Sequence, residues 1–160
     1  MFKREKCYMN SKIENLPKYR IAYVRQVGPY GFGNVQTMEK LKNWAAEKKH
    51  LDETAIVLGI SHDNPEITPP ESCRYDACIV IEKNEPIDDF VAESELPGGK
   101  YAIYEVEHTA EAIQKAWIEI FSNLLNSDYE IDTRPVFERY MKKMVDNHLC
   151  EICVPIRAKR

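Results

Sequence analysis

The stretch ENLPKYRIAYV at residues 14–24 returns in the second half of the chain as SELPGGKYAIYEV at residues 94–106. Leu16-Pro17 in the first copy corresponds to Leu96-Pro97 in the second, 80 positions later, and apolar or aromatic residues follow in both. An offset of half the chain length indicates an internal duplication. We therefore expect two similar units built around these two stretches.

Further correspondences downstream support the duplication. Val57-Leu58 corresponds to Val136-Phe137 at an offset of 79. Residues 76–81 (DACIVI) correspond to residues 151–156 (EICVPI) at an offset of 75, so small differences in loop length account for the drift. Asp76 and Glu151 occupy equivalent positions, and we expect both to be carboxylates at strand ends.

Strands are predicted where short segments rich in β-branched and aromatic residues are bounded by Pro, Gly, Asn or Asp. These segments are residues 20–27, 55–61, 75–81, 100–107 and 151–156. Together with the helices they predict an α+β fold in one domain, 1–160, in which repeats at about 8–84 and 88–158 each have the order β-β-α-β-β. The polar segment KNEPIDD, at residues 83–89, is the expected hinge between them.

Two helices are predicted from apolar residues at helical spacing. The first is expected near residues 32–48, after the turn signal Gly28-Pro29. The second has Thr109 as its expected N-cap and Glu111 in its first turn, near the positive end of the helix dipole. Its inward-facing stripe comprises Ile113, Ala116, Trp117, Ile120, Phe121 and Leu124.

Residues 136–145 (VFERYMKKMV) fit two interpretations. Their apolar spacing favours a helix, whereas the duplication aligns VFERY with the strand segment VLGIS. We follow the duplication and predict a strand over 136–140, with a loop or short helix over 141–148.

Composition excludes several classes of protein. The 160 residues are 44% hydrophobic and 30% charged, as in ordinary globular proteins, and no run of 18 apolar residues exists. The N-terminus lacks the apolar region of a signal peptide, so we expect a cytoplasmic protein without a membrane anchor. The 22 basic and 26 acidic side chains leave a net charge of −4, which disfavours direct binding of nucleic acid.

The cysteines predict neither disulfides nor a metal site. There are five, an odd number, including Cys7, and no secretion signal accompanies them. Cys150 and Cys153 form a CxxC within a predicted strand, where residues three apart point to opposite faces. A zinc site needs a second ligand pair, and Cys73 and Cys78 are five apart. We therefore predict no bound metal and no cofactor.

Several motifs occur in order along the chain and together resemble a known family. They are RIAYVRQVGPYG (20–31), LGISHDNPEITPPESCRYDACIVI (58–81), LPGGKYAIYEVEHTAEAIQKAWIEIF (96–121), PVFERY (135–140) and EICVPI (151–156). The chain resembles the gyrase-inhibitor-like small-molecule-binding domain over residues 12–157. This module also serves as the effector-binding domain of AraC-type and MerR-type transcription regulators.

The resemblance implies two strand-helix-strand-strand units related by a pseudo-twofold axis, in antiparallel sheets, with a ligand groove between the halves. Family members bind hydrophobic, planar or cationic compounds against aromatic side chains and a pocket glutamate, which matches Glu138 here. Residues 107–109 (EHT) depart from the Gly-Pro-Tyr that many members repeat. The chain also shows no helix-turn-helix segment, so we do not expect a complete transcription regulator.

Aromatic residues near the predicted groove are the candidate ligand contacts. On a strand, Glu138 and Tyr140 share a face, which makes Tyr140 the natural companion of the glutamate. Tyrosines in the predicted strands and a tryptophan on the second helix are further candidates that can stack on a planar ligand, with core packing as the alternative. These residues are Tyr23, Tyr75, Tyr101, Tyr104 and Trp117.

His62 and Asp63, in SHDNP, have the residue types of an acid-base pair. Because adjacent side chains usually point apart and Pro65 marks a turn, we interpret the segment as a turn.

Three functions remain open at this point. The leading hypothesis is a stand-alone binding protein for hydrophobic, planar or cationic small molecules. The first alternative is a protein that binds and inhibits DNA gyrase. The second is a hydrolase of strained or electrophilic molecules, in which Glu138 is the general base and Tyr140 orients the substrate; we predict no catalytic residues otherwise.

Overall fold

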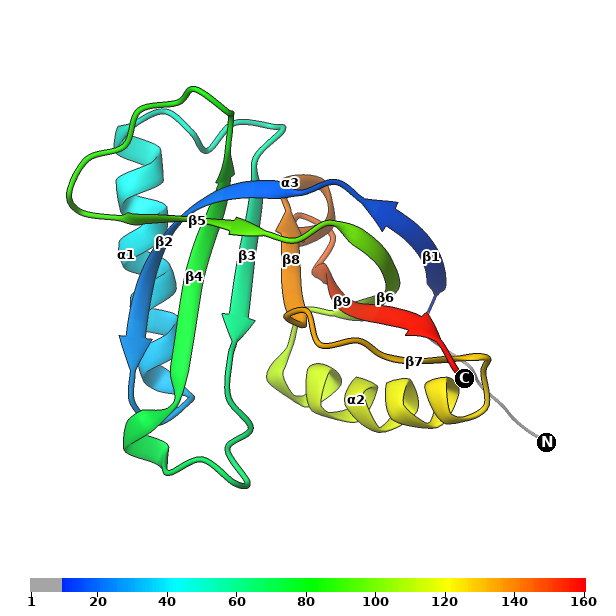
Figure 1. Ribbon diagram of the computed structural model, residues 1–160. Coiled ribbons are helices and arrows are strands. Elements are labelled where there is room, and N and C mark those ends of the chain that lie inside the picture. Colours follow the sequence, from blue (N-terminus) through cyan, green and yellow to red (C-terminus); the bar gives the residue numbers. More distant parts are fainter. Residues whose placement is uncertain (1–9) are drawn as a thin grey trace.

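The computed structural model describes residues 10–160, and Cys7 and the predicted start of the first repeat at residue 8 lie outside them. The fold is α+β, as predicted (Figure 1). Its strands are β1 (Ser11–Leu16), β2 (Tyr19–Val27), β3 (Ile56–Ser61), β4 (Arg74–Ile81), β5 (Ala92–Leu96), β6 (Gly99–Glu107), β7 (Tyr129–Ile131), β8 (Phe137–Met141) and β9 (Leu149–Ala158). Its helices are α1 (Phe32–Glu47), α2 (Ala110–Leu125) and α3 (Lys142–Val145), with a 3₁₀ turn at Pro70–Ser72.

The predicted order β-β-α-β-β is confirmed in the first repeat, and the second repeat adds only β7 and α3 to it. The ambiguous segment 136–145 divides into the strand β8 and the short helix α3. Within the residues described here, no helix combines the length and the hydropathy that crossing a bilayer requires.

One curled antiparallel sheet contains the strands in the order β1-β6-β9-β8-β3-β4-β2-β5, and β7 pairs with β9. This order is symmetric about the contact between β3 and β8. The repeats exchange their first strands, since β1 of the first pairs with β6 of the second, while β5 of the second pairs with β2 of the first. Each half of the sheet therefore contains one strand from the other repeat.

The exchanged strands form one long ribbon. Ser11 pairs with Tyr104 in the β1–β6 ladder, and Tyr23 pairs with Ala92 in the β2–β5 ladder, in the same register. The chain bends between the two ladders at Leu16-Pro17 and Leu96-Pro97, the motif that revealed the duplication. At this bend a Cβ on Gly98 would lie 2.6 Å from the carbonyl oxygen of Leu16.

The pseudo-twofold axis passes between Gly59 and Glu138. These residues pair directly across β3 and β8, and the offset of 79 makes them equivalent positions of the two repeats. Gly59 in one repeat thus corresponds to Glu138 in the other, so the side chains at the axis are asymmetric although the backbone is symmetric.

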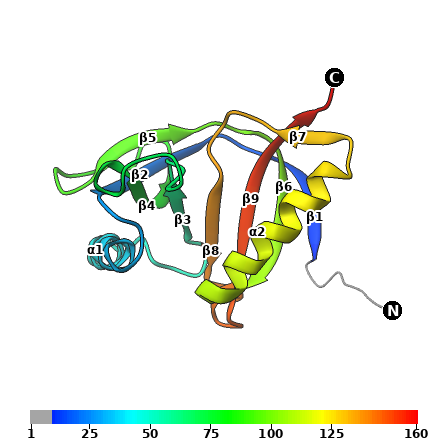
Figure 2. The ribbon, with the colours of Figure 1, turned by 90° about the horizontal axis from the view of Figure 1, so that it is seen from below.

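The two faces of the sheet carry separate parts of the core. Leu58, Tyr101, Phe137 and Cys153 pack inside the curl. The opposite face carries two clusters, one against α1 and one against α2, and the second includes Cys150. Cys150 and Cys153 therefore lie on opposite faces, as the strand prediction required. Figure 2 shows α1 and α2 on the same side of the sheet, flanking β3 and β8.

Helix α2 begins as predicted, with the side chain of Thr109 accepting a hydrogen bond from the backbone N–H of Ala112 at 3.0 Å. Its predicted stripe is only partly correct. Ala116, Ile120 and Leu124 are buried, but Phe121 is 52% exposed, because the inward face is narrower than the apolar stripe.

The prediction that Asp76 and Glu151 are strand-end carboxylates is wrong. Both lie inside their strands and are buried, at 3% and 4% exposure. Each is paired with an arginine, since Arg25 donates two hydrogen bonds to Asp76, at 2.7 and 2.8 Å, and Nε of Arg139 donates to Oε1 of Glu151 at 2.8 Å. An arginine partner is what allows a carboxylate to be buried as an ion.

Candidate functional site

A cavity of about 620 Å³ lies between α1 and α2, over the pseudo-twofold axis. Strands β3, β4 and β8 contribute Ser61, Tyr75, Glu138 and Tyr140. The helices and the turn before α2 contribute apolar and polar walls; these residues are Asn34, Val35, Met38, Glu39, Lys42, His108, Thr109, Ala110, Ile113 and Gln114. We call this the central cavity.

Glu138 is the acidic group of the central cavity. Its carboxylate accepts a hydrogen bond from the hydroxyl of Tyr140. Among residues 10–160 no Lys, Arg or His nitrogen lies within 4.0 Å of it. Burial raises the pKa of Glu138 above its usual range, and the hydrogen bond from Tyr140 opposes that shift. The cavity therefore holds a partly desolvated carboxylate that has no cationic partner in the described chain.

Tyr75 and Tyr140 line the central cavity together with Glu138. Burial and the charge of Glu138 raise the pKa of both phenols, so both remain protonated donors. Tyr75 is only 7% exposed, and a Cβ on Gly59 would lie 2.8 Å from its hydroxyl. The glycine on the axis thus leaves the space that the Tyr75 hydroxyl occupies.

His108 completes the wall near Tyr140. Its ring lies 5.0 Å from the Tyr140 ring, measured between centroids. Burial lowers the pKa of His108, as do the nearby Lys42 and His148, so the imidazole is neutral at pH 7. Sequence reasoning did not select His108 as a site residue, although residues 107–109 stood out as a departure from the family pattern.

A second cavity of about 500 Å³ adjoins the first. Ser61 and Glu138 line both, so the two hollows meet at these residues. The second cavity lies between the loop after β3 and α2; its other lining residues are Gly59, His62, Asp63, Asn64, Pro65, Glu66, Trp117, Phe121, Ile131, Val136 and Phe137. We call it the loop-side cavity, and the two together the groove.

Its loop wall is ordered by two carboxylates. Nε2 of His62 lies 2.7 Å from Oδ2 of Asp76, whereas Asp63 accepts hydrogen bonds from the backbone and guanidinium of Arg74. The adjacent side chains of His62 and Asp63 therefore point to different partners, as the turn interpretation predicted. The partner of His62 was missed because Asp76 lies 14 positions later, on the neighbouring strand.

The groove brings together four of the seven predicted ligand contacts: Glu138, Tyr140 and Tyr75 around the central cavity, and Trp117 in the loop-side cavity. Trp117 stacks at 5.5 Å against Phe121, whose exposed ring sequence reasoning had assigned to the core.

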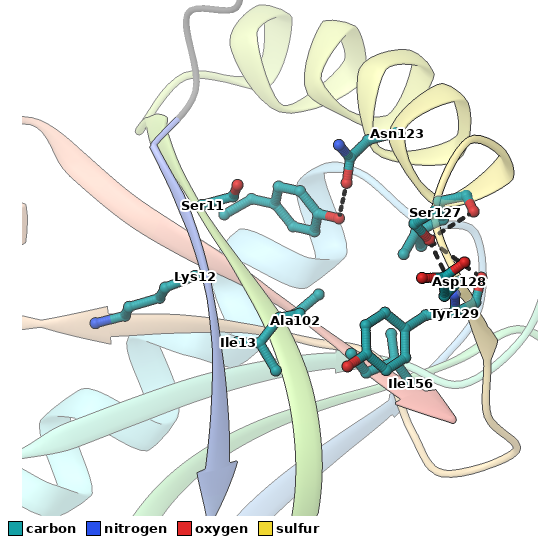
Figure 3. A pocket seen from close by; sticks show the side chains of 11 residues that line it. Ser11, Lys12, Ile13, Ala102, Asn123, Ser127, Asp128, Tyr129 and Ile156 are labelled. Atoms are coloured by element: carbon teal, nitrogen blue, oxygen red, sulfur yellow. Dashed lines mark hydrogen bonds between the residues drawn. The ribbon is translucent and has the colours of Figure 1, made fainter. Parts of the chain in front are cut away.

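The other three lie elsewhere in the structure. Tyr101 is fully buried inside the curl, where it meets Phe137 edge-on at 5.4 Å and donates a hydrogen bond to the carbonyl of Pro97. Tyr23 packs at the edge of the same core. Tyr104 donates to Oδ1 of Asn123 at 2.8 Å and lines a separate hollow beside β1 and the end of α2. Figure 3 shows that hollow, with Asn123 and Tyr129 on opposite sides.

Residues 10–160 contain no cluster of three or more His, Cys, Asp or Glu side chains arranged to hold a metal ion. The four described cysteines, Cys73, Cys78, Cys150 and Cys153, are unpaired and buried.

Comparison with protein families finds that the model of the GyrI-like small molecule binding domain matches residues 9–157. A prophage-derived protein of Bacillus subtilis (strain 168), YosT, whose name is that of a transcriptional regulator, is 42% identical over 150 residues, covering 93% of this chain and 100% of the relative. A protein of Salmonella arizonae named DNA gyrase inhibitor is 28% identical over 157 residues, covering 94% of this chain and 100% of the relative.

Solved structures share the fold. The C-terminal domain of EcmrR superposes with a TM-score of 0.73 at 13% identity, covering 96% of this chain and 100% of that one. SAV2435, solved with bound tetraphenylphosphonium, superposes with a TM-score of 0.57 at 13% identity, covering 92% of this chain and 94% of that one. Identities this low establish the common architecture alone.

Proposed function

Because this chain belongs to the GyrI-like small molecule binding domain family, we propose that it binds a hydrophobic organic cation with planar or aromatic groups in the groove. The observation that carries the proposal is the Glu138 carboxylate, which is desolvated, hydrogen-bonded to Tyr140 and without a described cationic partner. A bound cation would supply the missing charge in a site that already excludes much of the water.

The surroundings of Glu138 favour an organic cation over a hydrated inorganic one. Tyr75, Tyr140 and His108 line the central cavity together with the carboxylate, and Trp117 and Phe121 add two rings in the loop-side cavity. Aromatic faces attract a cation by about 0.5–2 kcal/mol each when they contact it. Tetraphenylphosphonium, bound in the structural neighbour SAV2435, is a suitable probe because it combines one charge with aromatic arms.

Glu138→Gln should weaken binding of tetraphenylphosphonium about fivefold to tenfold and leave a neutral planar ligand nearly unchanged. The amide keeps the size of the side chain and its bond to Tyr140 but removes the charge, and the attraction between two opposite unit charges a few ångströms apart is on the order of 1 kcal/mol even in water. Isothermal titration calorimetry measures both affinities. Glu119→Gln, which removes the same charge from an exposed position of α2, is the matched control.

Two further measurements, one on the wild-type protein and one on the variant, separate an effect on binding from an effect on folding. In the wild-type protein, affinity for the cation should fall on acidification from a higher pH than for an ordinary glutamate, because the pKa of Glu138 is raised. A raised folded-state pKa also means that ionised Glu138 opposes folding at neutral pH, so Glu138→Gln should keep or slightly raise the free energy of unfolding. Equal weakening of cationic and neutral ligands, or loss of folding, would contradict the proposal.

The gyrase-inhibitor names among the relatives support a second candidate function, binding to DNA gyrase. The segment 82–95, around the start of β5, carries six acidic side chains and one lysine. Asp88, Glu93 and Glu95 are paired with Lys48, Arg20 and Lys18, and the other three acidic side chains leave a net negative charge, which suits a protein that normally holds DNA. A supercoiling assay with the purified chain tests this candidate, and unaltered supercoiling at a molar excess would exclude it.

A further inference from the structure

We propose that His62 contacts the ligand and selects organic cations that carry a hydrogen-bond donor, a hydroxyl or an N–H, on the arm that enters the loop-side cavity. The inference rests on the proposed function, since Glu138 is taken as the partner of the charge. It adds a second polar contact, at the opposite wall of the loop-side cavity, which gives the groove a preference among cations of equal size and charge.

The His62 ring is held in one orientation. Its Nε2 lies 2.7 Å from Oδ2 of Asp76, and the carboxylate of Asp76 is itself fixed by the two hydrogen bonds from Arg25. Asp76 is buried at 3% exposure, so its position is set by the strand rather than by solvent. A ring supported in this way is a preorganised contact and loses little freedom when a ligand binds.

The contact with Asp76 also determines which ring nitrogen of His62 is available to a ligand. Burial alone would raise the pKa of Asp76, but the hydrogen bonds from Arg25 and His62 outweigh it and keep the group ionised. An ionised carboxylate only accepts hydrogen bonds, so Nε2 of His62 carries the proton. The other ring nitrogen, Nδ1, accepts a hydrogen bond when it carries no proton, and the only side-chain contact of the ring among the described residues is the one between Nε2 and Asp76.

Two neighbouring polar groups of the loop are already engaged. Asp63 is paired with Arg74, and Oδ1 of Asn64 accepts from the backbone N–H of Glu66. Ser61, Glu66 and Glu138 are the other polar residues of this cavity, and the remaining walls are apolar, with Trp117, Phe121 and Val136 lining the same space. A donor on a ligand arm that lies against the apolar walls would otherwise lose its bonds to water, so a hydrogen bond to His62 favours the cation that carries it.

Two probes that differ by one hydroxyl group test the inference: tetraphenylphosphonium and (4-hydroxyphenyl)triphenylphosphonium. The wild-type protein should bind the hydroxylated cation about fivefold to tenfold more tightly, the size of one satisfied hydrogen bond. In His62→Gln the side-chain amide can still donate to Asp76 but Nδ1 is lost, so the preference should fall below about twofold. His50→Gln, outside the groove, should keep the full preference.

The ratio of the two affinities within one protein does not depend on the fraction of folded molecules, so a destabilised variant remains informative. Equal affinity of both probes for the wild type, or a preference that survives in His62→Gln, would overturn the role of His62. Failure of the proposed function looks different, because Glu138→Gln would then leave both probes unaffected. If Glu138→Gln weakens both probes and the hydroxyl preference is absent, only the present inference fails.

Discussion

Arg139→Met should lower the free energy of unfolding by about 3–5 kcal/mol, the usual effect of removing one partner of a buried ion pair. Arg139 and Glu151 are 5% and 4% exposed, and Arg139 also donates to the hydroxyl of Tyr19 at 3.3 Å. Methionine fills much of the same space but leaves Glu151 as an uncompensated charge inside the curled sheet. A loss of this size is a large fraction of the total stability of a domain.

Urea unfolding followed by circular dichroism measures the effect, with Arg157→Met as the control. Arg157 makes the same kind of pair with Glu130 at 2.8 Å, but those side chains are 45% and 40% exposed, and exposed pairs contribute about 0–1 kcal/mol. Losses of similar size in the two variants would show that burial of the Arg139 pair is not what makes it important. The double replacement Arg139→Met with Glu151→Leu should recover most of the lost stability.

Gly98→Ala should cost about 1–3 kcal/mol, the range for overpacking a site that cannot relax. The added Cβ would lie 2.6–2.9 Å from main-chain atoms of Leu16, Pro17 and Lys18. Those atoms lie at the bend between the β1–β6 and β2–β5 ladders. Relief of the clash would therefore move the two paired segments of the ribbon apart. Thermal unfolding of the variant measures the cost.

Gly33→Ala provides the opposite case. Its Cβ would meet only the terminal amide of Gln26, a flexible side chain that can move, and alanine favours the helix in which residue 33 lies. We therefore expect no loss of stability in Gly33→Ala. A similar loss at both glycines would mean that the close approach at Gly98 is not decisive.

The duplication in the sequence predicted the elements because each repeat preserves its own pattern of apolar residues and turns. It also resolved residues 136–140, where periodicity alone favoured a helix. It did not predict which strands pair, since equivalent positions show that two segments have the same environment and not whether they take neighbours from their own repeat. The exchange of β1 and β5 could be found only from the register of the ladders.

The candidate site was predicted in part for a related reason. Alternation along β8 placed Glu138 and Tyr140 on one face, and the structure agrees. Alternation does not reveal which part of a face a helix covers. Tyr104 is buried in the cluster that packs against α2, whereas Tyr75 lines the central cavity. Nor does alternation reveal contacts across strands, so the support of His62 by Asp76 and the position of His108 over Tyr140 required the folded chain.

The exchanged strands also determine when the chain can fold during its synthesis. Ser11 finds its partner in Tyr104, 93 positions later, and Tyr23 finds its partner in Ala92. When the whole first repeat has left the ribosome, neither ladder of the ribbon can yet form. β1 therefore remains unpaired until β6 has been synthesised. Contacts of such long range make folding slow, because a large loop must close before they form. Translation of the second repeat thus sets the earliest moment at which either half can be completed.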